Sequence, residues 1–240
     1  MEDEYYMTEE QRVLRALQEE EKDKKFLKRR KKILIVVGIL AVLLIGFFIY
    51  EWIDDLNNPK VRKPVLYLYP EETTEVMVQL DFKGRLTTTY PKYENGWQVT
   101  AKPDGTLTDA AGKTYRYLYW EGVSDVDYDL TEGFCVKGSD TAEFLENALA
   151  QLGLTRAEAN EFIVYWLPYM ENNAYNIISF QNETYTENAK LLIKPQPDTV
   201  IRVFMTWRAG RKAVDIPEQK LTAPERTGFT VVEWGGCEVR

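Results

Sequence analysis

Hydrophobic and polar residues follow two different patterns along this chain. Residues 33–50 form an unbroken run of 18 uncharged, mostly apolar residues. A helix rises about 1.5 Å per residue, so this run would be about 27 Å long, close to the roughly 30 Å hydrocarbon core of a bilayer. Tyr50 and Trp52 lie at its end, where aromatic residues favour the membrane interface. The pattern predicts a single transmembrane helix over residues 33–53.

Beyond residue 63 the apolar positions recur with a period of two, which is typical of β-strands. Turn signals rich in glycine, proline, asparagine and aspartate separate these runs. Because short turns join most neighbouring runs, we expect antiparallel pairing. The predicted strands cover residues 65–69, 76–80, 86–90, 97–101, 115–120, 175–180, 190–194, 200–207 and 229–234.

A helical section interrupts the predicted strands. Asp140 can cap a first helix that ends before Gly153, and Thr155 with Glu158 forms a capping box for a second helix. Pro168 is expected to kink or end that second helix. The predicted fold class is therefore α+β: an N-terminal single transmembrane helix, then an antiparallel β-rich domain with an inserted helical hairpin.

Charge placement predicts how the chain is oriented in a membrane. Residues 22–32 hold eight Lys and Arg against one acid, whereas acids follow the apolar run. The positive-inside rule then places the N-terminus in the cytoplasm. The expected segments are a partly helical cytoplasmic tail (1–32), the membrane helix (33–53), a linker (54–62) and an extracytoplasmic α+β domain (63–240). A cleaved signal peptide and a buried core helix are the alternatives, but the apolar stretch of a signal peptide is usually shorter and ends in small residues.

Composition excludes several classes of function. The net charge is −8, and the chain from residue 51 onward holds 20 basic and 29 acidic residues. A nucleic acid is therefore not an expected partner, because its binding needs positive charge on the folded surface. The chain contains no histidine. Ser-His-Asp and Cys-His catalysis and zinc sites built on histidine are thus excluded, and no cofactor is predicted.

Motifs at both ends of the predicted domain look familiar. Residues 63–70 match a KPVIYLYP-type opening, and residues 228–236 match a GFTVVEWGG-type ending. Further matches lie at 90–91, 95–97, 119–122, 133–138 and 160–168. Together they resemble an uncharacterised bacterial domain family found in cell-envelope proteins, over about residues 63–236. The resemblance implies a bacterial envelope protein, and it carries no established activity from which catalytic residues could be transferred.

Two glutamates are the candidate catalytic residues. Glu121 follows Trp120, and Glu233 precedes Trp234, in each case near a predicted strand end and followed by glycine. A pair of carboxylates beside aromatic rings suits glycoside hydrolysis, with the tryptophans stacking on a sugar. The alternative is that both tryptophans belong to the core and both glutamates make structural hydrogen bonds.

Three tyrosines form a candidate ligand-binding face. Tyr115, Tyr117 and Tyr119 alternate along one predicted strand, so they would share one side of it. Tyrosine-rich faces serve recognition surfaces, and they equally serve the packing of a half-buried sheet.

The remaining candidates are acidic residues and thiols. Asp125, Asp127 and Asp129 alternate and could present oxygens to calcium, although the EF-hand spacing is not met. A solvated acidic face is the other interpretation. Cys135 and Cys237 are the two cysteines, and they could form a disulfide or remain separate thiols.

These observations predict a single-pass membrane-anchored extracytoplasmic binding or scaffolding protein of the bacterial cell envelope. Its expected partners are the lipid bilayer and either a cell-wall glycan or another envelope protein. Two alternatives stay open at this point: a glycan-acting hydrolase using Glu121 and Glu233, and a structural subunit of a membrane complex.

Overall fold

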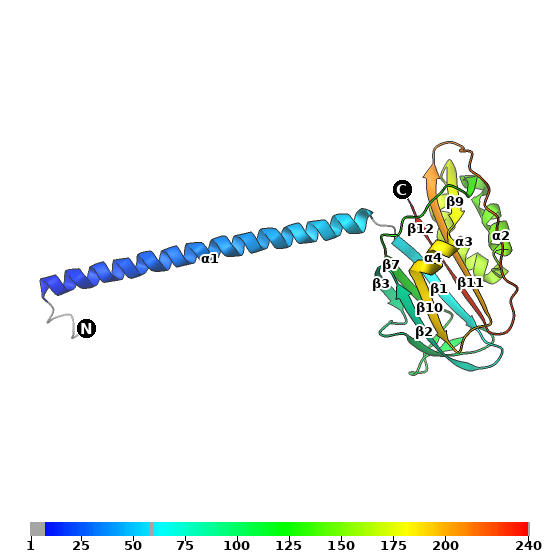
Figure 1. Cartoon of the computed structure of the whole chain (residues 1–240), viewed down its shortest axis with the longest axis horizontal. Helices are drawn as coiled ribbons and strands as arrows, with labels where there is room; N and C mark the ends of the chain where they lie inside the picture. Colours follow the sequence, from blue (N-terminus) through cyan, green and yellow to red (C-terminus); the bar gives the residue numbers. More distant parts are fainter. Residues whose placement is uncertain (1–7, 58–59, 240) are drawn as a thin grey trace. The chain divides into compact units, whose positions relative to one another are not determined.

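The computed structural model of the chain describes residues 8–57 and 60–239, which belong to two compact units that divide between residues 57 and 58 (Figure 1). The first unit consists of one helix, α1 (Glu9–Asn57). The second is the folded domain. The predicted linker over 54–62 is shorter than expected, because residues 54–57 continue α1 and residues 60–62 already belong to the first strand.

Helix α1 joins the predicted tail helix and the predicted membrane helix into one element of 49 residues. In its polar part, the pairs Glu20–Lys24 and Glu21–Lys25 lie 2.5 Å and 2.8 Å apart at the i,i+4 spacing that supports helices. Over residues 20–50 the helix is long and apolar enough to cross a membrane, judged by length and composition.

Two sheets form the framework of the domain, and their strands come from all parts of it. The seven-stranded sheet has the order β3 (Arg85–Tyr90), β7 (Leu118–Val123), β1 (Lys60–Tyr69), β12 (Thr230–Glu238), β11 (Thr199–Gly210), β9 (Tyr175–Phe180), β8 (Phe134–Lys137). The five-stranded sheet has the order β10 (Ala189–Lys194), β2 (Thr74–Phe82), β4 (Trp97–Ala101), β5 (Leu107–Thr108), β6 (Thr114–Tyr115).

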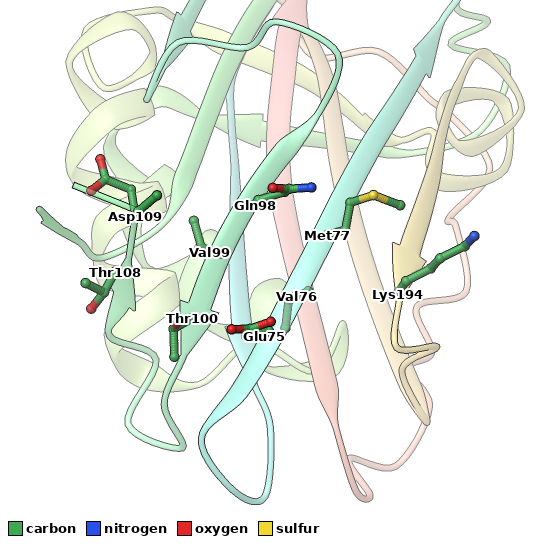
Figure 2. A pocket seen from close by; sticks show the side chains of 10 residues that line it. Glu75, Val76, Met77, Gln98, Val99, Thr100, Thr108, Asp109 and Lys194 are labelled. Atoms are coloured by element: carbon green, nitrogen blue, oxygen red, sulfur yellow. The ribbon is translucent and has the colours of Figure 1, made fainter. Parts of the chain in front are cut away.

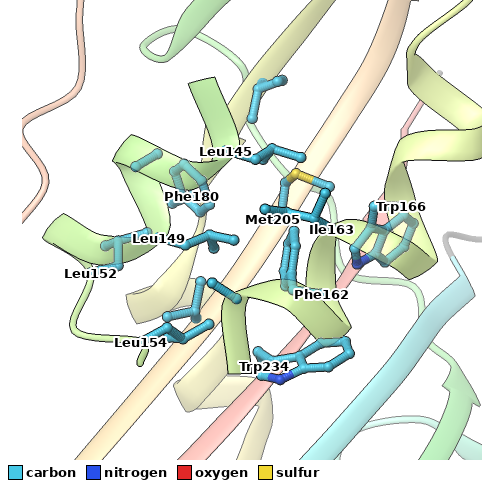
Figure 3. Packing of buried hydrophobic residues seen from close by; sticks show 14 of the residues in the cluster. Leu145, Leu149, Leu152, Leu154, Phe162, Ile163, Trp166, Phe180, Met205 and Trp234 are labelled. Carbon is cyan, nitrogen blue, oxygen red and sulfur yellow. The ribbon is translucent and has the colours of Figure 1, made fainter. Parts of the chain in front are cut away.

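The seven-stranded sheet is covered on both faces, which makes a three-layer domain. Helices α2 (Thr141–Gln151) and α3 (Arg156–Met170) pack on one face, where Leu149, Phe162 and Trp234 meet in the first core (Figure 3). The five-stranded sheet packs on the other face and encloses a second core. Alternation along β1 sends Tyr67 to the first core and Leu68 to the second.

The structure confirms the α+β fold class and the helical hairpin. The capping box is present at the start of α3, where the N–H of Thr155 donates to Oε2 of Glu158 at 2.7 Å and the N–H of Glu158 donates to Oγ1 of Thr155 at 3.4 Å. Pro168 lies inside the last turn, and α3 ends two residues later.

Three features differ from the sequence prediction. The pair β11–β12 is parallel, because the chain returns through residues 211–229 before it enters β12. The strand expected over 115–120 is divided between β6 and β7, which belong to different sheets. The short helix α4 (Asn182–Asn188) and the strands β5 and β8 were not predicted, since none of them has a clear apolar period.

Candidate functional site

The first strand of the domain carries an irregularity at Lys63 and Pro64. Lys63 has a φ of 57°, in the left-handed region that favours glycine. The register of β1 shifts here against both neighbours, β12 and β7, which defines a β-bulge. Gly235 gives it room, because a Cβ at that position would lie 3.1 Å from the Cα of Pro64. The N–H of Lys63 donates to Oε1 of Glu121 at 3.2 Å, so this carboxylate fixes the bulge.

The side chain of Lys63 lies among three tyrosine rings. Its Nζ is 5.3 Å from the ring centroid of Tyr117, 5.5 Å from that of Tyr119 and 5.7 Å from that of Tyr165. These distances are within the roughly 6 Å range of cation–π attraction. Each of these side chains is half-buried, so the group reaches solvent. We call Lys63, Tyr117, Tyr119, Glu121 and Tyr165 the Lys63 cluster.

The hydroxyls of Tyr119 and Tyr165 in the Lys63 cluster stay protonated at neutral pH. Burial, and after it the charge of Glu121, raises the pKa of Tyr119. The same two causes raise the pKa of Tyr165. The cluster therefore presents an ammonium group, a carboxylate and neutral phenols side by side. This combination can donate and accept hydrogen bonds and can stack on a flat ligand surface.

Glu233 lies on β12 between the two sheets and is fully buried. Its Oε2 is 2.6 Å from Nη2 of Arg202 and accepts a hydrogen bond from Nε at 2.7 Å. Its Oε1 accepts a hydrogen bond from Nε1 of Trp120 at 3.1 Å, and the ring of Tyr185 covers the guanidinium group at 4.7 Å. Burial alone would lower the pKa of Arg202, but the Glu233 carboxylate outweighs it and the pKa is raised. Arg202 is therefore charged, and both carboxylate oxygens of Glu233 are occupied.

The structure does not bring Glu121 and Glu233 together. Trp120 points between the sheets, where it bonds Glu233, so its neighbour Glu121 must point to the opposite face. The two carboxylates are separated by the seven-stranded sheet. A hydrolase of the predicted kind needs them about 5–10 Å apart on either side of one bond. This placement does not support the hydrolase alternative.

The two tryptophans beside these glutamates belong to the cores. Trp120 is 1% exposed and packs edge to face with Phe82, with ring centroids 4.9 Å apart. Trp234 is 0% exposed and packs in the same way with Phe162 at 5.3 Å. Neither indole face is open, so neither can stack on a sugar, and the core interpretation holds.

The three candidate tyrosines do not share one face. Tyr115 lies on β6 of the smaller sheet, where its hydroxyl donates to Oδ2 of Asp109 at 2.7 Å. This hydrogen bond raises the pKa of Tyr115 to about 12. Tyr117 and Tyr119 instead pack against the first core, under the helices. The prediction was wrong for Tyr115 because the chain changes sheets between residues 115 and 118.

The alternating aspartates lie on the outside of an irregular segment. Asp125, Asp127 and Asp129 are exposed, whereas Val126 is half-buried and Tyr128 is buried between them. Within residues 8–57 and 60–239, no group of three or more Cys, Asp or Glu side chains is arranged to hold a metal ion. The segment therefore has the form of a solvated acidic face over an apolar one.

The two cysteines are separate free thiols. Cys135 is half-buried on β8, and its Sγ accepts a hydrogen bond from the N–H of Val214 at 3.4 Å. Cys237 is fully buried in the core between the sheets, where burial raises its pKa. The structure thus does not form the disulfide that was one of the two predicted alternatives.

A hollow of about 350 Å³ lies over the smaller sheet, and its side chains do not converge on one centre (Figure 2). Glu75 and Lys194 come from different strands and lie apart in this view. The carboxylate of Asp109 is already used, because Oδ1 accepts the N–H groups of Ala111 and Lys113, each at 2.9 Å. The hollow is therefore a weaker candidate than the Lys63 cluster.

Sequence reasoning missed the residues that organise both glutamates. Lys63 was noted only as part of a motif, although a Lys-Pro dipeptide within a strand pattern is a signal for a bulge. Tyr165 was assigned to a helix, and no local pattern connects it with β7. Arg202 lies 31 residues from Glu233 and carried no signal, because the pairing of β11 with β12 was not predicted.

Comparison with known proteins gives one relative of unknown activity. No protein-family model matches the chain, and no solved structure matches it. The sequence is similar to a protein of Butyrivibrio fibrisolvens named "Uncharacterized protein in bglA 3'region". The two are 41% identical over 90 residues, which make up 36% of this chain and 93% of the relative. Since almost the whole relative is covered at this identity, the chain belongs to the same family as that uncharacterized protein.

Proposed function

We propose that this chain is a bacterial single-pass membrane protein that displays its folded domain on the outer side of the membrane. There the domain binds or scaffolds another component of the cell envelope. The relative from Butyrivibrio fibrisolvens, a bacterium, supports the proposed source. The resemblance of residues 63–236 to an envelope domain family supports the proposed place.

Exposed apolar side chains on α1 carry this proposal. Every side chain from residue 33 to residue 50 is exposed in the structure, for example Leu34 at 69% and Val42 at 68%. Leaving a large apolar side chain in water instead of burying it costs about 1.5–3 kcal/mol. Over 18 residues the cost is on the order of tens of kcal/mol, which insertion into a bilayer removes.

The orientation follows from the charges on either side of the span. Eight Lys and Arg precede it within residues 22–32, and residues 51–57 contain three acids and no base. Cationic flanks are retained on the cytoplasmic side during insertion. The domain that begins at residue 60 would then lie outside, where it meets cell-wall polymers and other envelope proteins.

The Lys63 cluster is the proposed contact surface. Tyr169, at 49% exposure, extends it, with its ring centroid 6.0 Å from that of Tyr165. Half-buried tyrosines give a rigid surface with polar tips, and Lys63 with Glu121 adds both signs of charge. A polar polymer such as a cell-wall glycan, or a polar protein surface, matches this chemistry.

Membrane topology is the first test. The full chain carrying a C-terminal epitope tag is expressed in bacterial cells, and membranes are washed with alkaline carbonate. We expect the chain to stay in the pellet and protease added to spheroplasts to remove the tag. A tag that stays protected in intact spheroplasts and is cleaved only after lysis would contradict the proposed orientation.

Binding is the second test. The full chain in detergent micelles is sedimented with purified peptidoglycan, and the bound fraction is compared with that of Tyr169→Ala. We expect several-fold weaker binding, because this substitution removes an exposed ring without opening the core. Tyr90→Ala is the matched control, since Tyr90 is 63% exposed and lies on β3, outside the Lys63 cluster. Equal losses in both variants would argue against this surface.

A further inference from the structure

The five-stranded sheet ends at β10, and a groove follows this edge. Among the described strands, β10 pairs with β2 on one side and has no neighbour on the other. The groove has a volume of about 820 Å³. It runs along residues 190–194 and reaches Val200 and Arg202 on β11. We call it the β10 groove.

The other three sheet edges differ from that of β10. At the β8 edge, the segment near residue 218 lies beside the start of the strand. There the N–H of Gly133 donates to the carbonyl of Pro217 at 2.8 Å. Strand β6 has two residues, and β3 exposes mainly polar side chains. Proteins usually shorten, cover or charge an edge strand, because its free backbone groups attract another strand. Strand β10 is charged by Lys190 and Lys194, and its edge of six residues is free beside an open groove.

Apolar and basic side chains line this edge together. Lys190, Leu192 and Lys194 are exposed and, by alternation, share the outer face of β10, with Leu192 at 52% exposure. Val200 is 41% exposed, as the smaller sheet leaves it uncovered. Asp81 is paired with Lys190 across the ladder, so one acid faces one of the two lysines.

Lys190 and Lys194 supply the positive charge of the groove, since Arg202 is already paired with Glu233. Another β10 strand from a second copy of the chain is a poor occupant. Antiparallel pairing of two β10 strands centred on Leu192 would put Lys190 of each copy opposite Lys194 of the other. Like charges directly opposite one another destabilise a ladder. The arrangement favours a strand that carries carboxylates at these two positions.

We propose that the β10 groove binds an extended acidic peptide segment of another protein by adding it to the sheet as a further strand. Main-chain hydrogen bonds to the free edge would hold the peptide, and side-chain positions would select it. The peptide carries acids beside Lys190 and Lys194 and an apolar residue beside Leu192. Its two inward side chains lie over Val200. The inference rests on the proposed function only for the side of the membrane on which the partner lies. Peptide binding itself does not depend on it.

A designed peptide tests the inference directly. The probe is dye-labelled acetyl-Glu-Val-Leu-Val-Glu-amide, whose pattern is the same in both strand directions. Its binding to the full chain in detergent micelles is followed by fluorescence anisotropy. We expect saturable binding, and at least about tenfold weaker binding when alternate backbone nitrogens are methylated, because methylation removes the donors of the ladder. Equal binding of the methylated peptide would overturn strand addition.

A charge exchange supplies the matched control. The double variant Lys190→Glu with Lys194→Glu should bind the probe at least about tenfold more weakly and should instead bind acetyl-Lys-Val-Leu-Val-Lys-amide. Binding of the second peptide also shows that the variant is folded. The variant Lys212→Glu with Lys220→Glu changes two exposed lysines outside the groove and should stay within about twofold of the parent. Equal effects of the two double variants would overturn the proposal.

Membrane topology does not enter this test. A domain on the cytoplasmic side would contradict the proposed function and leave peptide binding intact. Loss of peptide binding to a chain with the expected topology would contradict the inference alone.

Discussion

The two faces of the seven-stranded sheet hold their charges differently. On the face toward the smaller sheet, Glu233 is fully buried, with its oxygens taken by Arg202 and Trp120. On the face toward the helices, Glu121 is half-buried and accepts the N–H of Lys63, whose ammonium group lies among tyrosine rings. The first arrangement is closed to any ligand, whereas the second is open to solvent.

Layering explains this difference. The five-stranded sheet covers Glu233 completely, so its charge needs a buried partner to offset the cost of desolvation. Helix α3 covers only part of the opposite face near β7, and Lys63 and Glu121 keep contact with water, which screens their charges. A carboxylate beside a tryptophan can thus be buried in a structural ion pair or open to a ligand. Which of the two holds depends on how completely the neighbouring layer covers that face of the sheet.

The largest expected effect comes from removing the buried carboxylate. Glu233→Ala leaves Arg202 buried and without its partner, which should lower the free energy of unfolding by about 3–5 kcal/mol. Thermal and urea unfolding of the full chain in detergent micelles, followed by near-ultraviolet circular dichroism, measures this loss.

A double variant separates the missing charge from the missing volume. Glu233→Leu with Arg202→Met replaces the pair by apolar side chains, and it should recover most of the lost stability. If Glu233→Ala alone changed the free energy of unfolding by less than about 1 kcal/mol, the buried pair would not stabilise the domain as proposed.

Alkaline pH should destabilise the domain by a smaller amount for each tyrosine. Burial, followed by Glu233, raises the pKa of Tyr185, and burial, followed by Glu161, raises that of Tyr67. Above about pH 10 the unfolded chain loses these protons while the folded chain keeps them, so stability falls as pH rises. In that range each such tyrosine lowers the free energy of unfolding by about 1.4 kcal/mol per pH unit. Unfolding between pH 8 and pH 12 tests this, and Tyr185→Phe should make the decline less steep.

The smallest expected effect is on the open face. Glu121→Gln keeps an oxygen that can accept the N–H of Lys63, so the free energy of unfolding should change by less than about 1 kcal/mol. The pKa of Tyr119 should fall towards its usual value, as a neighbouring negative charge is removed. Ultraviolet titration of tyrosinate measures the shift. A loss of stability as large as that of Glu233→Ala would show that both faces are equally structural.

Local patterns predicted most elements but not the environment of the two glutamates. The apolar, β-prone run at residues 65–69 located β1, and the capping box of Thr155 and Glu158 located α3. Alternation also predicts that Trp120 and Glu121 point to opposite faces of the sheet. Alternation does not predict which of these faces a second layer covers, because that depends on pairings between distant strands.

The partners of both glutamates depend on such distant pairings. Arg202 reaches Glu233 because β11 and β12 lie parallel, across a connection of residues 211–229 that carries no strand signal of its own. Lys63 reaches Glu121 because β1 pairs with β7 at a bulge, 58 residues along the chain. Turn signals predict antiparallel pairing of strands that a short turn joins, whereas β1 and β7 are not consecutive and β11 and β12 are joined by a long connection.

The position of β1 also bears on how the domain responds to mechanical load. β1 begins three residues after α1 ends, and it is flanked by β7 on one side and β12 on the other. A pull on the α1 end of the chain would enter the domain through an interior strand held by two ladders, instead of through an outer strand that can be peeled away bond by bond. A domain connected in this way is suited to hold its fold under tension.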